Sequence, residues 1–596
     1  MKRNRTVSLC MIVKNEEKHL ERCLSSVKEL VDEMIIVDTG SRDNTVEIAK
    51  KFNAKIFYYD WDDNFSNARN FSIQHATKDW ILLMDGDDEF NKEDYEKYTK
   101  VINDSKKDGH YFKTLSFVGN IPSNDVVSNL NLRLLRNNKK YKFIGAIHEQ
   151  ITCVTDKMDY KNFSTEDIRI FHYGYLNNVA IEKNKRNRNI SIIEEELKAN
   201  PHNPFHLFNL GNEYFAMGNK EKALKLFNSV YDNLNWNDGF ASKLVIRRIM
   251  CLDELGKYGE ALQAIEEGLK IYPEFTDLEL IRGWIHLKNK KYTLAIDSFN
   301  KCLELGEAPS QLEFLNGCGT FRPYQALGEI YFQFEDYYKS LECFEEVLKL
   351  NPYLQNPIYK IGALLNKLYD NKRYVSYKLS QYFNLEHVSN LLLISDVLIT
   401  EGLYDLAKGY LEKAKELEEN NQQVNFQINR ILFYQKKYTD ALSGFNTLSK
   451  KSNEYKESLK YIFICGLITD TDYSEEVLNY IKNGNESFLY RVYLQLYNVF
   501  LGENKAILLE EDDHEKALKL IMKIIVEVLK AQEFELFEKL LHVLNYLESN
   551  RVLLELAAMY HNNGFKEMAV KEILRSIKEL NAIDAKGVEI LYKEIR

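Results

Sequence analysis

The chain has 596 residues, about four times a typical domain of roughly 150 residues, so one hydrophobic core cannot organise all of it. Hydrophobic residues make up 45% and charged residues 28%, with only 8 prolines, a balance that argues against long disordered tracts. The formal net charge of -10, without a long basic run, argues against a nucleic-acid binder or a binder of anionic membranes.

The cysteine pattern and the hydropathy indicate the cellular compartment that we expect for this protein. The eight cysteines include no C-x-x-C pair, so neither a zinc module nor a disulfide framework is indicated. The apolar run Val7–Val13 follows basic residues as in a signal peptide, but it is short and lacks a small-residue cleavage site. No 18 consecutive residues are apolar, so no membrane span is predicted. We expect a cytoplasmic protein.

The first 90 residues alternate short apolar runs with stretches of helical periodicity. The runs predict four strands at Val7–Val13, Met34–Val37, Lys55–Tyr58 and Trp80–Met84. Helices are predicted between them at Glu16–Lys28, around Val46–Ala49 and at Ala68–Ala76. This alternation predicts an α/β unit with a mainly parallel sheet.

The loops that follow these strands are expected to meet. Ligands bind at the carboxyl ends of parallel strands, so loops starting at Lys14, Asp38, Asp60 and Asp85 should converge on one crevice. Residues 110–180 are more mixed, with strand-like segments at Tyr111–Val118 and Asn131–Leu135. We assign them to the same domain, over residues 1–185.

From about residue 182 the strand signals give way to an internal repeat of helix pairs that resembles the tetratricopeptide repeat. A small residue is needed where the two helices of a repeat cross, and seven positions supply one: Ala223, Ala261, Ala295, Ser340, Ala407, Ala441 and Ala569. We predict repeats over residues 186–450 and divergent helical repeats over 451–596, with no register for 451–548. Stacked pairs form a concave face, the usual surface for an extended peptide or a partner protein.

The sharpest local feature is the acidic segment Asp85–Glu89 directly after a predicted strand. Alternating carboxylates at a strand end suit a hard divalent cation, which in turn neutralises a diphosphate. The alternative is an acidic surface loop without a ligand. An EF-hand is excluded because Phe90 occupies the position that needs glycine.

Three further groups are candidates. Asp38 follows a strand and faces the crevice, although a turn at Gly40 with a helix cap explains its neighbours. Arg69, predicted to open a helix, suits a phosphate or a base, with a surface ion pair as the alternative. His148-Glu149 offers a general base or a ligand and His172 another ligand, although a lone histidine is more often structural. No P-loop, G-x-G-x-x-G or G-x-S-x-G motif occurs.

Five segments together closely resemble the family 2 glycosyltransferases, in the subgroup that fuses the catalytic domain to tetratricopeptide repeats and includes peptide-modifying enzymes. They are Ser8–Glu17, Asp38–Ser41, Phe65–Asn70, Trp80–Asp88 and Gly145–Gln150. The resemblance implies a GT-A type nucleotide-sugar-binding domain followed by an all-α solenoid. It also implies an inverting transferase that uses a nucleotide-diphosphate sugar, usually UDP-linked, with Mg²⁺ or Mn²⁺.

The same resemblance assigns roles by position. By this resemblance, Asp38 contacts the base or ribose and Arg69 contacts the nucleotide. Asp85 and Asp87 contact the ribose and the metal. Glu149, beside His148, is the catalytic base, and His172 is a further metal ligand. Many family members carry a second acid where this chain has Thr39, so recognition of the base is less well supported than metal binding.

Three functions stay open at this stage. The first is glycosylation of a Ser, Thr or Cys side chain on a peptide or protein docked on the concave face of the repeats. The second is synthesis of a cell-surface polysaccharide or glycolipid, which the lack of an Arg-Trp pair and of membrane spans disfavours. The third is a repeat scaffold without catalysis. Relatives of this architecture often dimerise through the helical region, so a homodimer is one expected state.

Overall fold

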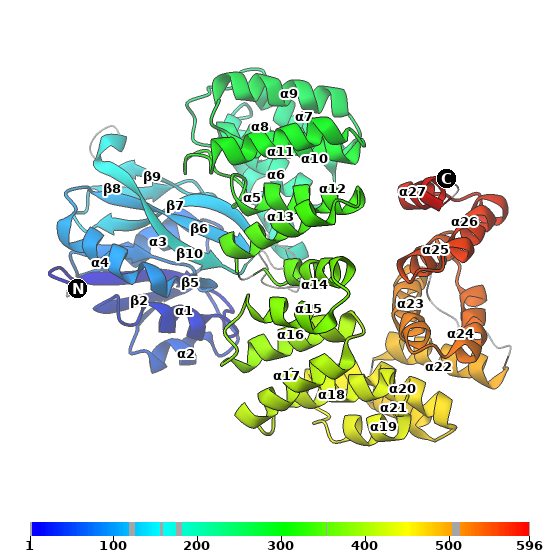
Figure 1. The fold of residues 1–596 in the computed structure, drawn as a ribbon. Coiled ribbons are helices and arrows are strands. Elements are labelled where there is room, and N and C mark those ends of the chain that lie inside the picture. The colour runs from blue at the N-terminus through cyan, green and yellow to red at the C-terminus, as the bar shows by residue number, and fades with distance from the viewer. Residues whose placement is uncertain are drawn as a thin grey trace. The chain divides into compact units, whose positions relative to one another are not determined.

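The computed structural model describes residues 3–117, 126–154, 159–174, 182–352, 354–484, 486–503, 510 and 513–594 (Figure 1). The chain divides into two compact units, Met1–Ile361 and Gly362–Arg596. The first unit contains the sheet and the first helical repeats, and the second is helical. Among the described residues, no helix combines the length and the apolar character that crossing a bilayer requires.

An eight-stranded sheet organises the first unit, in the order β3-β2-β1-β4-β7-β6-β10-β5. Its strands are β1 (Val7–Val13), β2 (Glu33–Asp38), β3 (Lys55–Tyr58), β4 (Trp80–Leu83), β5 (Asp88–Phe90), β6 (Gly109–Phe117), β7 (Val126–Arg136) and β10 (Phe163–His172). The run β3-β2-β1-β4 is parallel, as is the pair β6–β10, whereas β7 and β5 are antiparallel to their neighbours. A separate hairpin pairs β8 (Tyr141–Ile144) with β9 (Gln150–Cys153). The predicted α/β class with a mainly parallel sheet is confirmed.

Strands β1, β2 and β4 are covered on both faces, which explains why their sequences are mostly apolar. One core joins the sheet to α1 (Leu20–Val27), α2 (Thr45–Lys51) and α4 (Tyr95–Asp104). The other joins it to α3 (Phe65–Gln74) and the β8–β9 hairpin. Alternate residues of β1 divide between the two, since Leu9 and Met11 pack in the first core and Cys10 in the second.

One predicted detail differs from the structure. Arg69 does not open a helix, because α3 begins at Phe65, where the Asn64 side chain accepts a hydrogen bond from Asn67 N at 3.0 Å. Arg69 therefore lies in the middle of the helix. The strand predicted at Tyr111–Val118 is β6, and Val118 lies outside the described residues.

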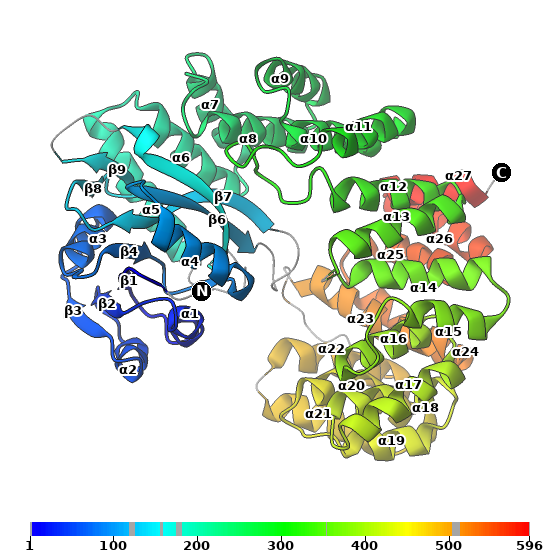
Figure 2. The same ribbon diagram turned by 60° about the vertical axis from the view of Figure 1, so that its left-hand side comes forward.

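Helix pairs follow the sheet in the first unit (Figure 2). They are α5 (Glu182–Ala199), α6 (Pro204–Ala216), α7 (Lys220–Tyr231), α8 (Ala241–Glu254), α9 (Tyr258–Ile271), α10 (Thr276–Lys288), α11 (Tyr292–Leu305), α12 (Phe321–Gln333) and α13 (Tyr337–Leu350). The small residues predicted at the crossings are fully buried, among them Ala223 and Ser340. A Cβ at Gly211 would lie 2.4 Å from the Phe227 ring, so the paired helices touch there.

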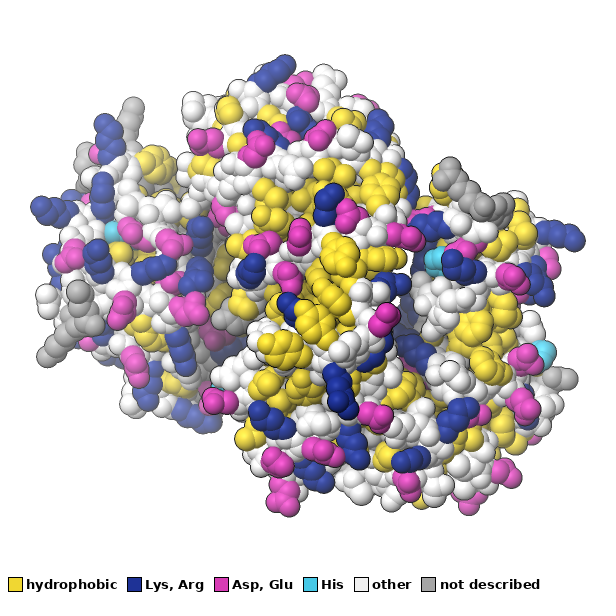
Figure 3. Space-filling view, in the orientation of Figure 1, with side chains coloured by type: hydrophobic (Ala, Val, Ile, Leu, Met, Phe, Trp, Pro, Cys, Tyr) yellow, Lys and Arg dark blue, Asp and Glu magenta, His cyan; other side chains and the backbone are white. Residues whose placement is uncertain are grey.

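The second unit continues with helices, and α14 (Asn356–Leu368) runs across the division. The others are α15 (Lys372–Ser380), α16 (Val388–Thr400), α17 (Tyr404–Leu417), α18 (Gln422–Tyr434), α19 (Tyr438–Asn446), α20 (Asn453–Thr469), α21 (Tyr473–Asn483), α22 (Ser487–Leu501), α23 (His514–Lys530), α24 (Phe534–Leu541), α25 (Val552–Asn562), α26 (Lys566–Leu580) and α27 (Ala585–Glu594). Acidic and basic side chains are interspersed on the face drawn in Figure 3. The predicted domain boundaries at 185 and 450 stay predictions.

Candidate functional site

The loops after β1, β2 and β4 meet at the carboxyl edge of the sheet. Asn15 N donates to Ser41 Oγ at 2.9 Å, and Arg42 N donates to Asn15 Oδ1 at 2.9 Å. A Cβ at Gly86 would lie 2.8 Å from the Glu16 side chain, so the loop after β4 lies against the loop after β1. This is the convergence that the alternation of strands and helices predicts.

Asp85, which follows β4, lies between two arginines. Its Oδ1 accepts from Arg69 Nη2 at 3.2 Å and its Oδ2 from Arg133 Nη1 at 3.3 Å. Arg69 Nε also donates to Glu149 Oε1 at 2.7 Å, so the four side chains form one chain of ion pairs. Desolvation opposes ionisation of Asp85, yet the two guanidinium groups hold the pKa of its carboxyl well below the usual range. Asp85 is therefore an anion at neutral pH.

Asp87 and His172 face the same space beside Gly174. A Cβ at Gly174 would lie 2.3 Å from Asp87 Oδ2 and 2.7 Å from His172 Nε2, so only glycine leaves these two atoms unobstructed. The other ring nitrogen, His172 Nδ1, is 2.9 Å from Asp88 Oδ1. Asp88 is fully buried and fixes the orientation of the imidazole. Burial disfavours the imidazolium, but Asp87 and Asp88 raise the pKa of His172 to about 9.

The donor atoms of this group fit a divalent cation. One ligand atom from each of Asp87, Asp88 and His172 lies within 4.8 Å of the others. Asp88 is already engaged, because its Oδ2 lies 3.0 Å from Arg133 Nη1 and accepts from Asp85 N at 2.8 Å. Asp87 Oδ2 and His172 Nε2 are therefore the atoms that would bind the ion, with Asp88 as the carboxylate that orients the histidine.

The predicted catalytic pair lies on the loop between β8 and β9. Glu149 points to Arg69, while His148 is an exposed residue with a positive φ of 52°. The loop that begins at Asp60 reaches the same place, since Phe65 N donates to Ala146 O at 2.8 Å. The structure thus brings Arg69, Asp85 and Glu149 together at the site. The chemical roles of these residues stay predictions.

Asp38 forms hydrogen bonds within the turn after β2, a structural role that the sequence did not indicate. Its carboxylate accepts hydrogen bonds from Gly40 N at 3.2 Å and Ser41 N at 3.1 Å, and only 4% of the residue is exposed. Gly40 has a φ of 101°, which confirms the predicted turn. Asp38 thus stabilises the turn that follows β2, and its predicted contact with the base or ribose is not tested by this geometry.

Arg133 is the main residue of the site that sequence reasoning missed. It lies on β7 with 4% exposure, and besides the two aspartates it donates to Leu83 O and Thr114 Oγ1, each at 3.4 Å. The sequence feature that could have indicated its role is an arginine inside the strand-like segment Asn131–Leu135, because a charge buried in a strand requires partners.

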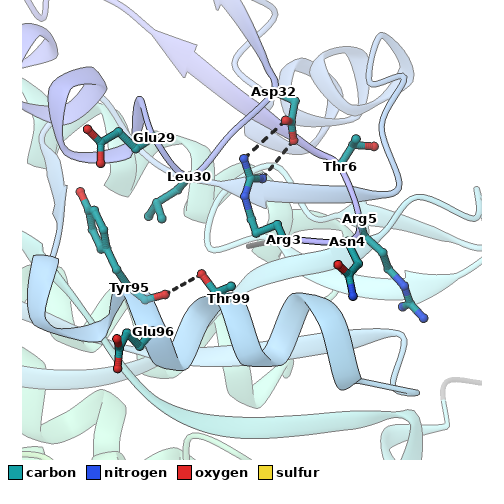
Figure 4. Close-up of a pocket in the computed structure, with 10 residues that line it drawn as sticks. All are labelled: Arg3, Asn4, Arg5, Thr6, Glu29, Leu30, Asp32, Tyr95, Glu96 and Thr99. Atoms are coloured by element: carbon teal, nitrogen blue, oxygen red, sulfur yellow. Dashed lines mark hydrogen bonds and ion pairs between the residues drawn. The ribbon is translucent and has the colours of Figure 1, made fainter. Parts of the chain in front are cut away.

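A pocket of about 510 Å³ lies elsewhere, at the amino end of β1 (Figure 4). The pocket is lined by residues before β1, by the loop after α1 and by α4, and Arg3 pairs with Asp32 there at 3.0 Å. The acidic and histidine residues described above do not line this pocket. It is therefore separate from the candidate site.

Comparison with known proteins agrees with this arrangement. Residues 8–158 match the family described as glycosyl transferase family 2, and residues 252–311, 321–353 and 388–421 match tetratricopeptide repeat families. The prophage-derived glycosyltransferase SunS of Bacillus subtilis is 28% identical over 393 residues, which are 64% of this chain and 86% of that protein.

Shorter or weaker likenesses involve one part of the chain. A tetratricopeptide-repeat protein of Synechococcus elongatus is 58% identical over 83 residues, 14% of this chain and 21% of that protein. The crystal structure of residues 1–349 of TarS from S. aureus is 15% identical and covers 42% of this chain and 87% of that one, with a TM-score of 0.23. The assignment rests on the family matches: the chain carries a family 2 glycosyltransferase domain followed by tetratricopeptide repeats.

Proposed function

We propose that this glycosyltransferase moves a sugar, with inversion, from a UDP-linked donor to a Ser, Thr or Cys side chain of a peptide or protein held by the repeats. The observation that carries the proposal is the grouping of Asp85, Asp87, His172 and Glu149 at the carboxyl edge of β4. In an open α/β sheet this is the edge where nucleotides bind. The match to family 2 supports a nucleotide-sugar donor.

Asp87 Oδ2 and His172 Nε2 would hold a Mg²⁺ or Mn²⁺ ion. Carboxylate oxygen suits both ions, while the imidazole nitrogen favours Mn²⁺ over Mg²⁺. When bound, the cation offsets the negative charge that develops on the departing diphosphate. Asp85, kept anionic by Arg69 and Arg133, would accept hydrogen bonds from the ribose hydroxyls.

Glu149 is the proposed general base. Its bond to Arg69 fixes the carboxylate at the crevice, where it needs to come within about 3 Å of the acceptor proton. A Cys acceptor, with a free pKa of about 8.5, yields its thiolate with little help, whereas a Ser or Thr hydroxyl does not. The Glu149→Gln variant therefore distinguishes the acceptors, with a large loss of rate for Ser or Thr and a smaller loss for Cys.

Mass spectrometry tests the proposal directly. Proteins and peptides that co-purify with the chain are incubated with it, with Mn²⁺ and with several UDP-sugars. We expect a gain of one hexose or N-acetylhexosamine on a Ser, Thr or Cys side chain, absent with Asp87→Asn. Transfer to a polysaccharide or lipid fraction alone would refute the protein acceptor. A chain that neither transfers nor hydrolyses any sugar nucleotide would be a scaffold.

A further inference from the structure

The loop Gly145–Glu149, which carries the proposed base, is held by two helices outside the regions that match either family. Helices α5 and α6 span residues 182–216, between the glycosyltransferase match that ends at 158 and the repeat match that begins at 252. Glu196 of α5 accepts a hydrogen bond from Ala146 N through Oε1 at 3.2 Å. Ile147 is buried against Ile192 and Ile193 of α5 and Leu210 of α6.

The opposite side of the same loop is fixed by α3. Ala146 O accepts from Phe65 N at 2.8 Å, and Gly145 O accepts from Ser66 Oγ at 2.6 Å. The Ala146 residue is therefore held at its carbonyl by the catalytic domain and at its amide by α5. Such a hold is needed, because Gly145 and His148 both have positive φ, a conformation that neighbouring structure must stabilise in a non-glycine residue.

Helix α5 is itself firmly attached to α6. Glu213 of α6 is 6% exposed and accepts from Arg186 Nη1 at 3.1 Å and from Asn189 Nδ2 at 3.0 Å. These contacts fix the face of α5 that presents Glu196 to the loop. His206 Nε2 lies 3.8 Å from Glu196 Oε2, so the hydrogen bond from Ala146 N is the shorter of these two described contacts.

We propose that Glu196 is a positioning residue for transfer and that α5 and α6 belong to the catalytic unit rather than to an acceptor-docking platform. The inference rests on the proposed function, in which Glu149 is the base. Glu196 sets the position of Ala146, three residues before Glu149, against the fixed end of α3. Transfer is sensitive to such placement, since a shift of about 1 Å can cost roughly a hundredfold in rate.

Three variants of the full chain test this. Glu196→Ala removes the acceptor for Ala146 N–H, Glu196→Gln keeps a carbonyl oxygen there, and Glu195→Ala is the matched control. Glu195 is the adjacent residue, and its Oε1 pairs with Lys198 at 2.5 Å on the surface. We expect kcat to fall at least tenfold in Glu196→Ala with KM for the sugar nucleotide unchanged, and Glu196→Gln and Glu195→Ala to stay within about threefold of wild type.

A second measurement does not depend on activity. Hydrogen exchange of the peptide that contains Gly145–Glu149 should be faster in Glu196→Ala than in wild type and Glu195→Ala. Equal exchange in all three, or equal kcat in Glu196→Ala and Glu195→Ala, would overturn the inference. An inactive wild type would refute the proposed function instead, and the exchange result would still decide whether Glu196 holds the loop.

Discussion

Replacing Arg133 with methionine removes a buried positive charge from between two aspartates. Its Nη1 lies 3.0 Å from Asp88 Oδ2 and 3.3 Å from Asp85 Oδ2. Removing one partner of a buried ion pair costs about 3–5 kcal/mol. In the variant, Asp85 still accepts a hydrogen bond from Arg69, and Asp88 still contacts Asp85 N and His172. We therefore expect a cost at the lower end of this range, a loss of about 3 kcal/mol in the free energy of unfolding of the catalytic domain.

Urea unfolding followed by tryptophan fluorescence measures this loss. Replacing the two tryptophans of the helical region with phenylalanine leaves Trp61 and Trp80 as reporters of the catalytic domain. A double-mutant cycle with Asp88→Asn should recover part of the loss, because the cost arises from an uncompensated buried carboxylate. A destabilisation below about 1 kcal/mol, or no coupling in the cycle, would refute this reasoning.

Two other substitutions have equally definite outcomes. Hydrogen bonds from Lys55 and Ser8, each 2.6 Å long, outweigh burial and lower the pKa of Glu33 to about 2. The stability that Glu33 supplies is complete above its ordinary pKa of 4.5 and is lost as the pH falls through about 2, so the advantage of wild type over Glu33→Gln in urea should shrink between pH 5 and pH 2. An advantage that grows on acidification would contradict this. Gly174→Ala places a methyl group 2.3 Å from Asp87 Oδ2, which forces the Asp87 side chain to move, so calorimetry should show at least tenfold weaker Mn²⁺ binding. Unchanged affinity would argue against that ion position.

Strands β1, β2 and β4 could be predicted because they are buried on both faces and read as apolar runs. Strand β10 could not, because its sequence mixes apolar residues with Ser164, Glu166 and Asp167. Strand β5 has three residues, Asp88–Phe90, and exists only through its pairing with β10. Neither pattern has a local period that distinguishes a strand from a loop.

The residues of the site also divide into those that could be predicted from local sequence and those that could not. Asp85 and Asp87 were predictable because they follow an apolar strand directly. The helical repeats were predictable because small residues recur at the helix crossings, with a separation of 34 residues from Ala261 to Ala295 and from Ala407 to Ala441. Arg133 acts from inside a neighbouring strand, where only pairing between β4 and β7 brings it to Asp85. Glu196 lies fifty residues from its partner Ala146, and no local pattern indicates that contact.

Titration calorimetry with Mn²⁺ and UDP tests the central claim, that Asp87 and its neighbours bind a cation that carries the donor's diphosphate. Wild type should release heat with UDP only when Mn²⁺ is present. Asp87→Asn should lose this heat, while the matched control Asp472→Asn, from the acidic pair at Asp470 and Asp472 in the helical unit, should keep it. Metal-independent UDP binding, the same heat from Asp87→Asn, or no heat from wild type with any nucleoside diphosphate would contradict the account.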